Sequence, residues 1–254
     1  MERIVVAVRA SAELNDDVVL SEGGLDIDED YLTYHLSEWD AAALDAAGQL
    51  GQSVTAVSVG GDEADTALRE AVALGAERAV RIDPGEHGHD VLTVARLLSQ
   101  FVQQETPGLV LCGVQSSDHG GGAVPAALAG YLGWARACGV NKAADSEDGW
   151  ITVTRELEGG VQEEGWLALP AVLSIQTGAY EQRFPSFMAK RKAASHQIQL
   201  VSPEDLGLGA DTLETTRGSE RVALERPLTN AGIVLDGSAS DVAEQIMSLL
   251  KEKL

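Results

Sequence analysis

The sequence predicts an α/β protein in which helices cover a mainly parallel β-sheet. Over the first 135 residues, short runs of apolar and β-branched residues alternate with longer amphipathic stretches, as in repeated strand–helix–strand units. Residues 150–170 instead alternate apolar and polar side chains around a Glu-Gly-Gly turn, which is typical of an antiparallel hairpin. A hydrophobic fraction of 44% allows a chain of this length to bury a substantial core.

The predicted elements follow one another at regular spacing. Continuous apolar runs of the type buried on both faces of a parallel sheet lie at residues 4–8, 53–59, 76–82, 109–114 and 171–176. Amphipathic stretches that predict helices lie at residues 38–50, 63–75, 90–104 and 123–133. Because each of the first four runs is followed by a helical stretch, right-handed crossovers and parallel pairing are expected.

The first crossover carries a long polar insertion. Residues 10–36 include a Gly-Gly pair between short extended segments, which indicates a small hairpin. The helix after it starts beyond Ser37, whose hydroxyl makes a good N-terminal cap. Asp40 stands at the third helical position, so an arrangement close to a capping box is expected.

The C-terminal quarter has little apolar sequence. Residues 202–235 are punctuated by Gly and Pro and predict an extended arm. An amphipathic helix is predicted over residues 238–254, with Ser240 or Asp241 as its cap. The chain is therefore expected to have two parts, an α/β domain over residues 1–200 and a C-terminal arm and helix over residues 201–254 that dock on another subunit.

The chain is strongly acidic, with 40 Asp and Glu residues against 18 Lys and Arg and a formal net charge of −22. A surface of this sign repels nucleic acid and anionic lipid, so neither is an expected partner. No stretch approaches the ~20 apolar residues of a membrane span, and the N-terminal sequence MERIVVAVRA lacks the apolar core of a signal peptide. We therefore expect a cytoplasmic protein without direct membrane insertion. A salt-rich cytoplasm or high solubility alone would explain the charge.

The segment most indicative of a binding site is rich in glycine. Residues 111–123, LCGVQSSDHGGGA, run from the end of the fourth predicted strand into the start of a helix. Ligands of open parallel sheets bind at the carboxyl ends of the strands, and a glycine-rich turn lets backbone N–H groups approach a phosphate. A turn that is merely flexible remains the alternative.

Motifs of the common enzymes of this fold class are missing from the sequence. There is no GxGxxG after the first strand, no GxxxxGK[ST] and no GxSxG elbow. His87 and His89 stand in a polar loop and are expected to be solvated. Cys112 follows an apolar run and is expected in the core, and no Cys/His cluster has metal-ligand spacing. We therefore expect no catalytic residues and no metal.

Eight short motifs, spread in order over residues 2–210, resemble one protein family. They are Val5–Arg9, Thr55–Gly60 with Ala67–Arg78, Pro107–Gln115, Leu132–Trp134, Arg155–Gly160, Leu169–Val172, Glu181–Pro185 and Asp205–Gly207. In this combination they are similar to the beta subunits of electron-transfer flavoproteins and to their nitrogen-fixation relatives.

The resemblance implies a Rossmann-like domain that binds the adenine nucleotide AMP, with a partner alpha subunit that holds most of the FAD site. It implies a heterodimeric electron carrier that accepts electrons from a flavin-dependent dehydrogenase and passes them to a downstream acceptor. A second FAD in this chain is the less favoured occupant. By position, the nucleotide pocket would include Ala7, Ser37, Glu38, Trp39, Asp40, Val59, Gly113, Gln115, Asp118, Gly120, Gly121, Gly122, Ala123 and Val124. The partner-recognition segment would include Arg183, Phe184, Phe187, Met188 and Lys190.

Three positions depart from the family's pattern. The family loop D-D-x-N-Q-T is here Asp118-His-Gly-Gly-Gly-Ala, so a phosphate would depend on backbone amides. Ser37 replaces an Asn, and the recognition segment is shorter and lacks a leucine, which leaves Phe187 or Phe184 as its anchor. Two other interpretations stay open: a stand-alone nucleotide-binding protein of universal-stress type, and a structural subunit of a dehydrogenase complex with a vacated pocket.

Overall fold

The computed structural model describes residues 3–13, 18–28, 31–85, 90–146, 149–209, 211–213, 222–225 and 232–253. The expected solvated pair His87 and His89 lies outside these residues. The chain divides into two compact units, Met1–Val222 and Ala223–Leu254, and each is described here by itself.

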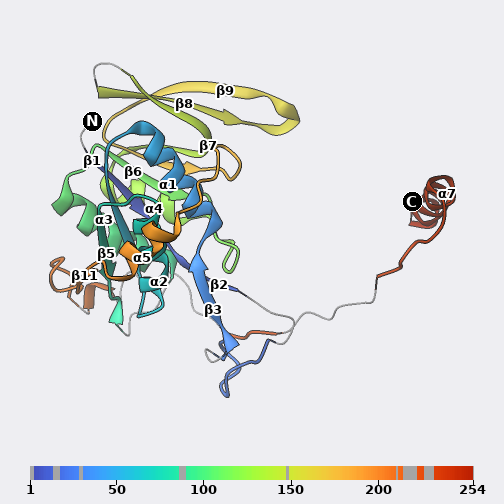
Figure 1. The fold of residues 1–254 in the computed structure, drawn as a ribbon, viewed down its shortest axis with the longest axis horizontal. Coiled ribbons are helices and arrows are strands. Elements are labelled where there is room, and N and C mark those ends of the chain that lie inside the picture. The colour runs from blue at the N-terminus through green and yellow to red at the C-terminus, as the bar shows by residue number, and fades with distance from the viewer. Residues whose placement is uncertain are drawn as a thin grey trace. The chain divides into compact units, whose positions relative to one another are not determined.

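A large mixed sheet forms the centre of the first unit (Figure 1). Among the described residues its nine strands lie in the order β11-β5-β4-β1-β6-β10-β7-β8-β9. The parallel strands are β1 (Arg3–Ala7), β4 (Ser53–Val59), β5 (Arg78–Ile82), β6 (Leu109–Gly113), β10 (Ala171–Ile175), β11 (Gln199–Val201) and β7 (Ala135–Ser146). β7 also begins an antiparallel meander with β8 (Trp150–Glu156) and β9 (Gln162–Ala168). The α/β class with a parallel sheet and a hairpin addition is confirmed.

Helices cover both faces of this sheet because successive residues of each buried strand point to opposite sides. On one face, Ile4 and Val6 pack with α1 (Glu38–Leu50) and α2 (Ala64–Ala73). On the other face, Val5 and Val57 pack with α3 (Val91–Glu105) and α4 (Val124–Leu132). Two apolar layers thus hold the central strands in place.

Three elements were not predicted from the sequence. β7 contains Ala, Gly, Asn and Lys, which have low strand propensity, and it is a strand because β10 and β8 pair with it. α5 (Phe187–Ala194) is a short cationic helix whose cap, Ser186, accepts a hydrogen bond from the Ala189 amide at 3.2 Å. β11 adds an edge strand beside β5. Four residues beyond position 200 lie buried in the same core as α3 and α4: Val201, Leu206, Leu208 and Leu213.

The polar insertion folds as the hairpin that its sequence indicated. β2 (Ala10–Glu13) and β3 (Thr33–Leu36) form a separate antiparallel pair. Nearer the tip, Leu20 and Ile27 form a bridge, and Gly24 supplies a turn with φ of 64°. Such positive φ values suit glycine.

The second unit ends in α7 (Ala239–Lys253), which confirms the predicted C-terminal helix. Its cap is Ser238, and the expectation of Ser240 or Asp241 is wrong because both lie inside the helix. Asp241 Oδ2 accepts a hydrogen bond from the Ser238 amide at 3.0 Å, and Ser238 Oγ lies 3.3 Å from the Asp241 amide. This reciprocal pair is a capping box in which Asp replaces the usual Glu.

Candidate functional site

A pocket opens at the carboxyl ends of the central parallel strands. Strand order reverses between β1 and β6, and such a switch point leaves a crevice in open sheets. Apolar side chains from β4 and α3 form one wall: Val57, Val59, Val91, Val94 and Leu98. The loop from β6 to α4 forms the other wall. The site therefore combines an apolar side with a glycine-rich backbone side, as many ligand pockets do.

Asp40 ties the two central strands together at the floor of this pocket. Its Oδ2 accepts the Arg9 amide and its Oδ1 accepts the Gly113 amide, each at 2.8 Å. Burial raises the pKa of Asp40 to about 7, although both amides and the charge of Arg9 act in the opposite direction. The expectation that Asp40 belongs to a capping box is therefore wrong, because both carboxylate oxygens are used by strand ends.

Ser37 occupies the cap position of α1, but its hydroxyl makes no capping hydrogen bond. The Ser37 Oγ is buried and has no hydrogen-bond partner among the described residues. The predicted side-chain cap is thus absent from this helix start. Without that bond, the hydroxyl carries part of the cost of a buried unsatisfied polar group.

Gly113 is glycine because α1 passes against it. A Cβ at this position would lie 2.6 Å from Asp40 Oδ1 and 2.7 Å from the backbone carbon of Trp39. A contact this short with backbone cannot be relieved by rotating a side chain. Gly113 therefore sets the distance between α1 and β6 as well as lining the pocket.

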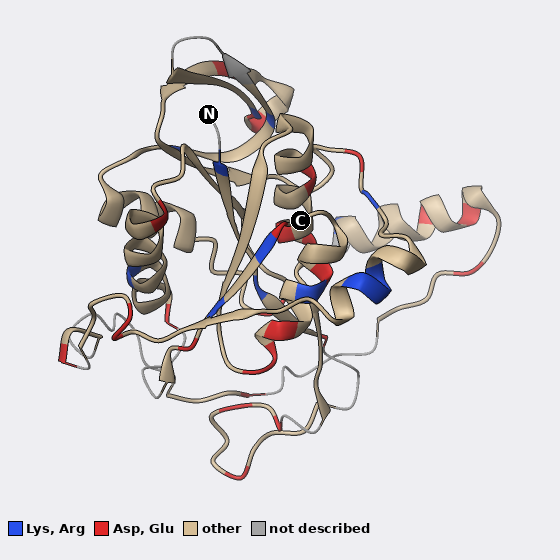
Figure 2. Ribbon diagram, turned by 60° about the vertical axis from the view of Figure 1, so that its left-hand side comes forward, with Lys and Arg blue, Asp and Glu red and all other residues tan. Residues whose placement is uncertain are grey.

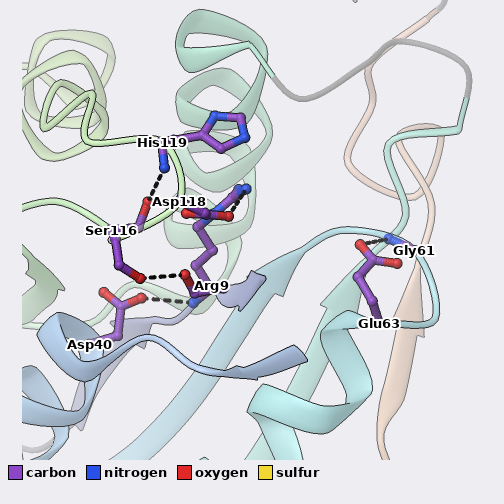
Figure 3. A network of polar contacts seen from close by, with 9 residues as sticks. Arg9, Asp40, Gly61, Glu63, Ser116, Asp118 and His119 are labelled. Carbon is purple, nitrogen blue, oxygen red and sulfur yellow. Dashed lines mark hydrogen bonds and ion pairs between the residues drawn. The ribbon is translucent and has the colours of Figure 1, made fainter. Parts of the chain in front are cut away.

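Arg9 reaches from the end of β1 to the β6–α4 loop and forms an ion pair with Asp118 (Figure 3). Arg9 Nε lies 3.1 Å from both Asp118 oxygens, and Nη2 lies 2.8 Å from Oδ2. Burial opposes ionisation of Asp118, but hydrogen bonds from Arg9 and Ser116 outweigh it and hold the pKa of Asp118 well below its usual range. The Asp118 carboxyl therefore stays ionised at all ordinary pH values.

The glycines of the loop differ in their backbone requirements. Gly120 and Gly122 both have φ of 58°, and a Cβ at Gly122 would lie 3.3 Å from the Val114 carbonyl oxygen. Gly121 does not have a positive φ, and a Cβ there would meet nothing within 4 Å. Two glycines thus shape the loop, and the third, Gly121, has open space around its Cβ position.

The structure brings together nine of the fourteen residues assigned to the pocket by resemblance. Those nine are Ala7, Asp40, Val59, Gly113, Gln115, Gly121, Gly122, Ala123 and Val124. Ser37, Glu38, Trp39, Asp118 and Gly120 do not line it. The lining residues that sequence reasoning missed are Val8, Arg9, Val57, Val91, Val94, Leu98, Cys112, Val114, Ser116, His119 and Pro125. The sequence could have indicated two of these residues. Val57 shares a strand face with Val59, and Arg9 directly follows β1, at the edge of the sheet where ligands bind.

A second candidate surface surrounds α5. Phe184, Phe187 and Met188 expose 81%, 79% and 68% of their surface, so none of them fills the core of the first unit. Lys190, Arg191 and Lys192 form a continuous cationic run on this helix, in a ribbon that is otherwise mainly red and tan (Figure 2). Exposed aromatic and cationic side chains in this combination are typical of protein-binding surfaces.

Arg183 is also exposed, with 44% of its side-chain surface accessible, but it is held by hydrogen bonds to α1. Its Nε donates to the buried Asp45 carboxylate at 2.7 Å, and its Nη2 donates to the Leu44 carbonyl at 2.8 Å. Arg69 makes a similar contact at the other end of the segment, where its Nη1 donates to the Ala194 carbonyl at 2.8 Å. The two arginines fasten α5 and the residues before it to α1 and α2.

The chain is an open-sheet α/β protein with a pocket at the carboxyl ends of its parallel strands. A family model described as the electron transfer flavoprotein domain matches residues 24–206. The chain belongs to that family and, within it, to the beta subunits of electron transfer flavoproteins, as the eight motifs predicted.

Similarity to beta subunits of this family extends over most of the chain. The electron transfer flavoprotein subunit beta of Methylophilus methylotrophus is 36% identical over 98% of both chains. The subunit of Mycobacterium tuberculosis is 30% identical over 89% of both, and that of Bacillus subtilis is 27% identical over 98% of both. Among the described residues, no helix has the length and apolar character needed to cross a bilayer.

Proposed function

We propose that this chain is the nucleotide-binding, non-catalytic subunit of a heterodimeric electron carrier. In this proposal an alpha subunit holds most of the FAD, a flavin-dependent dehydrogenase donates the electrons, and a downstream acceptor receives them. The observation that carries the proposal is the pocket at the carboxyl ends of β1, β4 and β6, in a chain whose family is that of electron transfer flavoproteins. FAD would supply the reversible electron uptake.

The residues of the pocket fit an adenine nucleotide. Valine and leucine side chains from β4 and α3 offer an apolar surface to a purine ring. Gly121 leaves open space where a side chain would project. On the opposite wall of the pocket, the glycine-rich loop leads directly into α4. Ala123, at the cap position of this helix, provides no side-chain acceptor for its first amides. Those amides suit a phosphate, so AMP is the occupant that we propose.

The ionisable groups of the pocket support a binding role rather than a catalytic one. Asp40 already accepts two backbone amides, and Arg9 is paired with Asp118. Burial and the nearby Asp40 raise the pKa of the Cys112 thiol well above its usual range, so it stays protonated. A general base must reach the proton that it removes, and the Asp40 carboxyl, although its pKa is about 7, is buried and already accepts both amides. We therefore propose that the chain positions its ligand and contributes no catalytic residue.

The proposed contact with the dehydrogenase is the exposed α5 surface. Phe184 or Phe187 would enter a pocket on the partner, and Met188 and Lys190 would contact its rim. Arg183 would hold this segment in place through its hydrogen bonds to α1. We further propose that the arm and α7 dock on the alpha subunit, because α7 exposes Ile246, Met247 and Leu250.

The test is to co-produce the chain with its alpha subunit, purify the complex and extract its nucleotides. FAD together with AMP supports the carrier with a filled pocket. Two FAD per heterodimer would place a second FAD in the beta pocket, and FAD alone would favour a structural subunit with a vacated pocket. A yellow, monomeric, FAD-saturated preparation of this chain by itself would rule out the division of roles proposed here.

A further inference from the structure

We propose that Arg9 is the phosphate-recognising side chain of the pocket and that Asp118 orients it. The proposal rests on the proposed function, because it assigns a residue to the nucleotide that the pocket would hold. It adds a charged side chain to a site where the sequence indicated backbone amides alone.

The geometry leaves part of the Arg9 guanidinium available to a ligand. Its contacts with Asp118 use Nε and Nη2, and no acceptor among the described residues is bonded to Nη1. A guanidinium has five N–H donors in a planar fork, so several donors remain outside the ion pair. Arg9 lines the pocket while Asp118 does not, which places the carboxylate behind the arginine as its support.

The charge balance of the pocket requires such a cation. Asp40 lies at the floor of the pocket, Asp118 lies behind Arg9, and Arg9 is the sole Lys or Arg among the described lining residues. Because Asp118 stays ionised, a dianionic phosphate that met only amides would be repelled by this carboxylate at short range. A planar guanidinium binds phosphate oxygens in pairs and stays charged at every accessible pH.

The loop chemistry points to the same residue. Gly120, Gly121, Gly122 and Ala123 have no polar side chains, and Pro125 at the start of α4 lacks an amide donor. One of the first amide donors of α4 is therefore lacking, and a charge-assisted bond from Arg9 would add to the amides that remain and make up for the missing polar side chains. A purely structural clamp between β1 and the loop is the alternative, and it would affect all ligands of the pocket equally.

The experiment compares AMP with adenosine, which differ only in the phosphate. Calorimetric titration of the nucleotide-stripped complex with the alpha subunit gives the affinity for each ligand. Arg9→Gln alone would leave the Asp118 carboxylate buried and unpaired, so the main variant is Arg9→Gln with Asp118→Asn. The matched control is Arg78→Gln with Glu105→Gln, which removes another arginine–carboxylate pair, with contacts of 2.8 and 3.2 Å, away from the pocket.

We expect the Arg9→Gln/Asp118→Asn variant to bind AMP about 10-fold or more weakly, since bonds to charged groups are that strong. Its adenosine affinity should stay within about twofold of the wild-type value, as should both affinities of the control. Arg9→Lys, which keeps the charge but loses the fork, should bind AMP with intermediate affinity.

Two results would overturn the assignment of Arg9 while leaving the nucleotide pocket in place. One is an unchanged ratio of AMP to adenosine affinity in the double variant, and the other is an equal loss for both ligands, which indicates a structural clamp. A wild-type complex that binds neither ligand would instead refute the pocket itself and the inference with it. FAD content and melting temperature, measured on every variant, confirm that the complexes compared are folded.

Discussion

The Nε of Arg183 lies 2.7 Å from Oδ1 of Asp45, and this bond joins the segment before α5 to the buried side of α1. The guanidinium rests beside Gly48, where a Cβ would come within 2.6 Å of Nη1. A helical glycine thus makes room for an arginine from a part of the chain far away in sequence. The segment that carries the exposed aromatic residues after Arg183 is therefore attached to α1.

Arg183→Ala should lower both stability and partner docking. It leaves the buried Asp45 carboxylate without its cation, which should cost about 1 to 3 kcal/mol of unfolding free energy. Thermal or urea unfolding of the complex measures this loss. Arg183→Gln combined with Asp45→Asn removes both charges and should recover much of the stability. If the single variant is as stable as wild type, the ion pair is not a structural contact.

Phe187→Ala should slow electron transfer from the dehydrogenase without affecting the fold. Because Phe187 is exposed, the unfolding free energy should change by less than about 0.5 kcal/mol. Loss of a true anchor should weaken docking by about 2 kcal/mol, roughly thirtyfold. Stopped-flow reduction by the dehydrogenase gives the docking constant. Leu200→Ala, another exposed apolar residue, serves as the control and should transfer electrons normally.

Gly121→Val should reduce the nucleotide content of the complex. A Cβ there would meet no atom within 4 Å, and the backbone needs no positive φ, so folding should be little affected while the added side chain takes up space beside the pocket that Gly121 lines. Gly122→Ala should instead destabilise the loop by about 1 kcal/mol or more, because its φ is 58°. Gly130→Ala within α4 should be neutral or stabilising. Nucleotide content that is unchanged in Gly121→Val would place the ligand elsewhere.

The stability of the protein should fall as pH rises through neutrality, with Asp40 as one cause. A carboxyl group whose folded pKa is about 7 against an ordinary value of 3.8 favours the fold in its protonated form. Its contribution is complete below pH 4 and is lost by about pH 7 to 8. We expect a difference on the order of 1 to 4 kcal/mol between pH 5.5 and 8.

Asp40→Asn isolates this contribution from that of the other acids. The variant should be less stable at pH 5.5, since an amide cannot accept from both the Arg9 and Gly113 N–H groups. Its stability should also vary less between the two pH values than that of the wild type. Parallel pH curves for the two proteins would show that Asp40 does not titrate in this range.

Deletion of residues 237–254 should abolish stable association with the alpha subunit. Val242, Ile246, Leu249 and Leu250 recur at helical spacing along α7, and an amphipathic helix of this length needs a partner surface to be stable. Co-purification of tagged alpha subunit measures the effect. Ile246→Ser with Leu250→Ser should reproduce it, whereas Glu244→Gln should not. Full recovery of alpha subunit by the deletion variant would contradict the docking role.

Apolar runs predicted the central fold well because those strands are buried on both faces. β4 and α1 have the predicted bounds, Ser53–Val59 and Glu38–Leu50. β7 was not predicted because its residues, ARACGVNKAADS, have no strand pattern of their own. Its conformation comes from pairing with β10 and β8. Tertiary contacts commonly override weak local preferences in this way.

The pocket was predictable only in part, since a motif identifies a loop but not the direction of a side chain. Part of the glycine-rich loop and the edge residues Ala7 and Val59 lie on the pocket wall. Trp39 and Asp118 were expected to line it, but Trp39 packs behind Gly113 and Asp118 turns toward Arg9. Arg9 was missed although it directly follows β1, because its pairing with Asp118 joins residues that are 109 positions apart in the sequence.

The two hydrogen bonds that Asp40 accepts from the Arg9 and Gly113 amides restrict how this site can change in evolution. A substitution at position 113 would collide with α1, and a substitution at position 40 would leave two strand ends without an acceptor. Neither change can be compensated at its own position, so lineages that alter one should alter the other and shift α1 as well. We therefore expect this pair to covary, and homologues that keep both should keep the same spacing between α1 and β6 whatever ligand their pocket has come to hold.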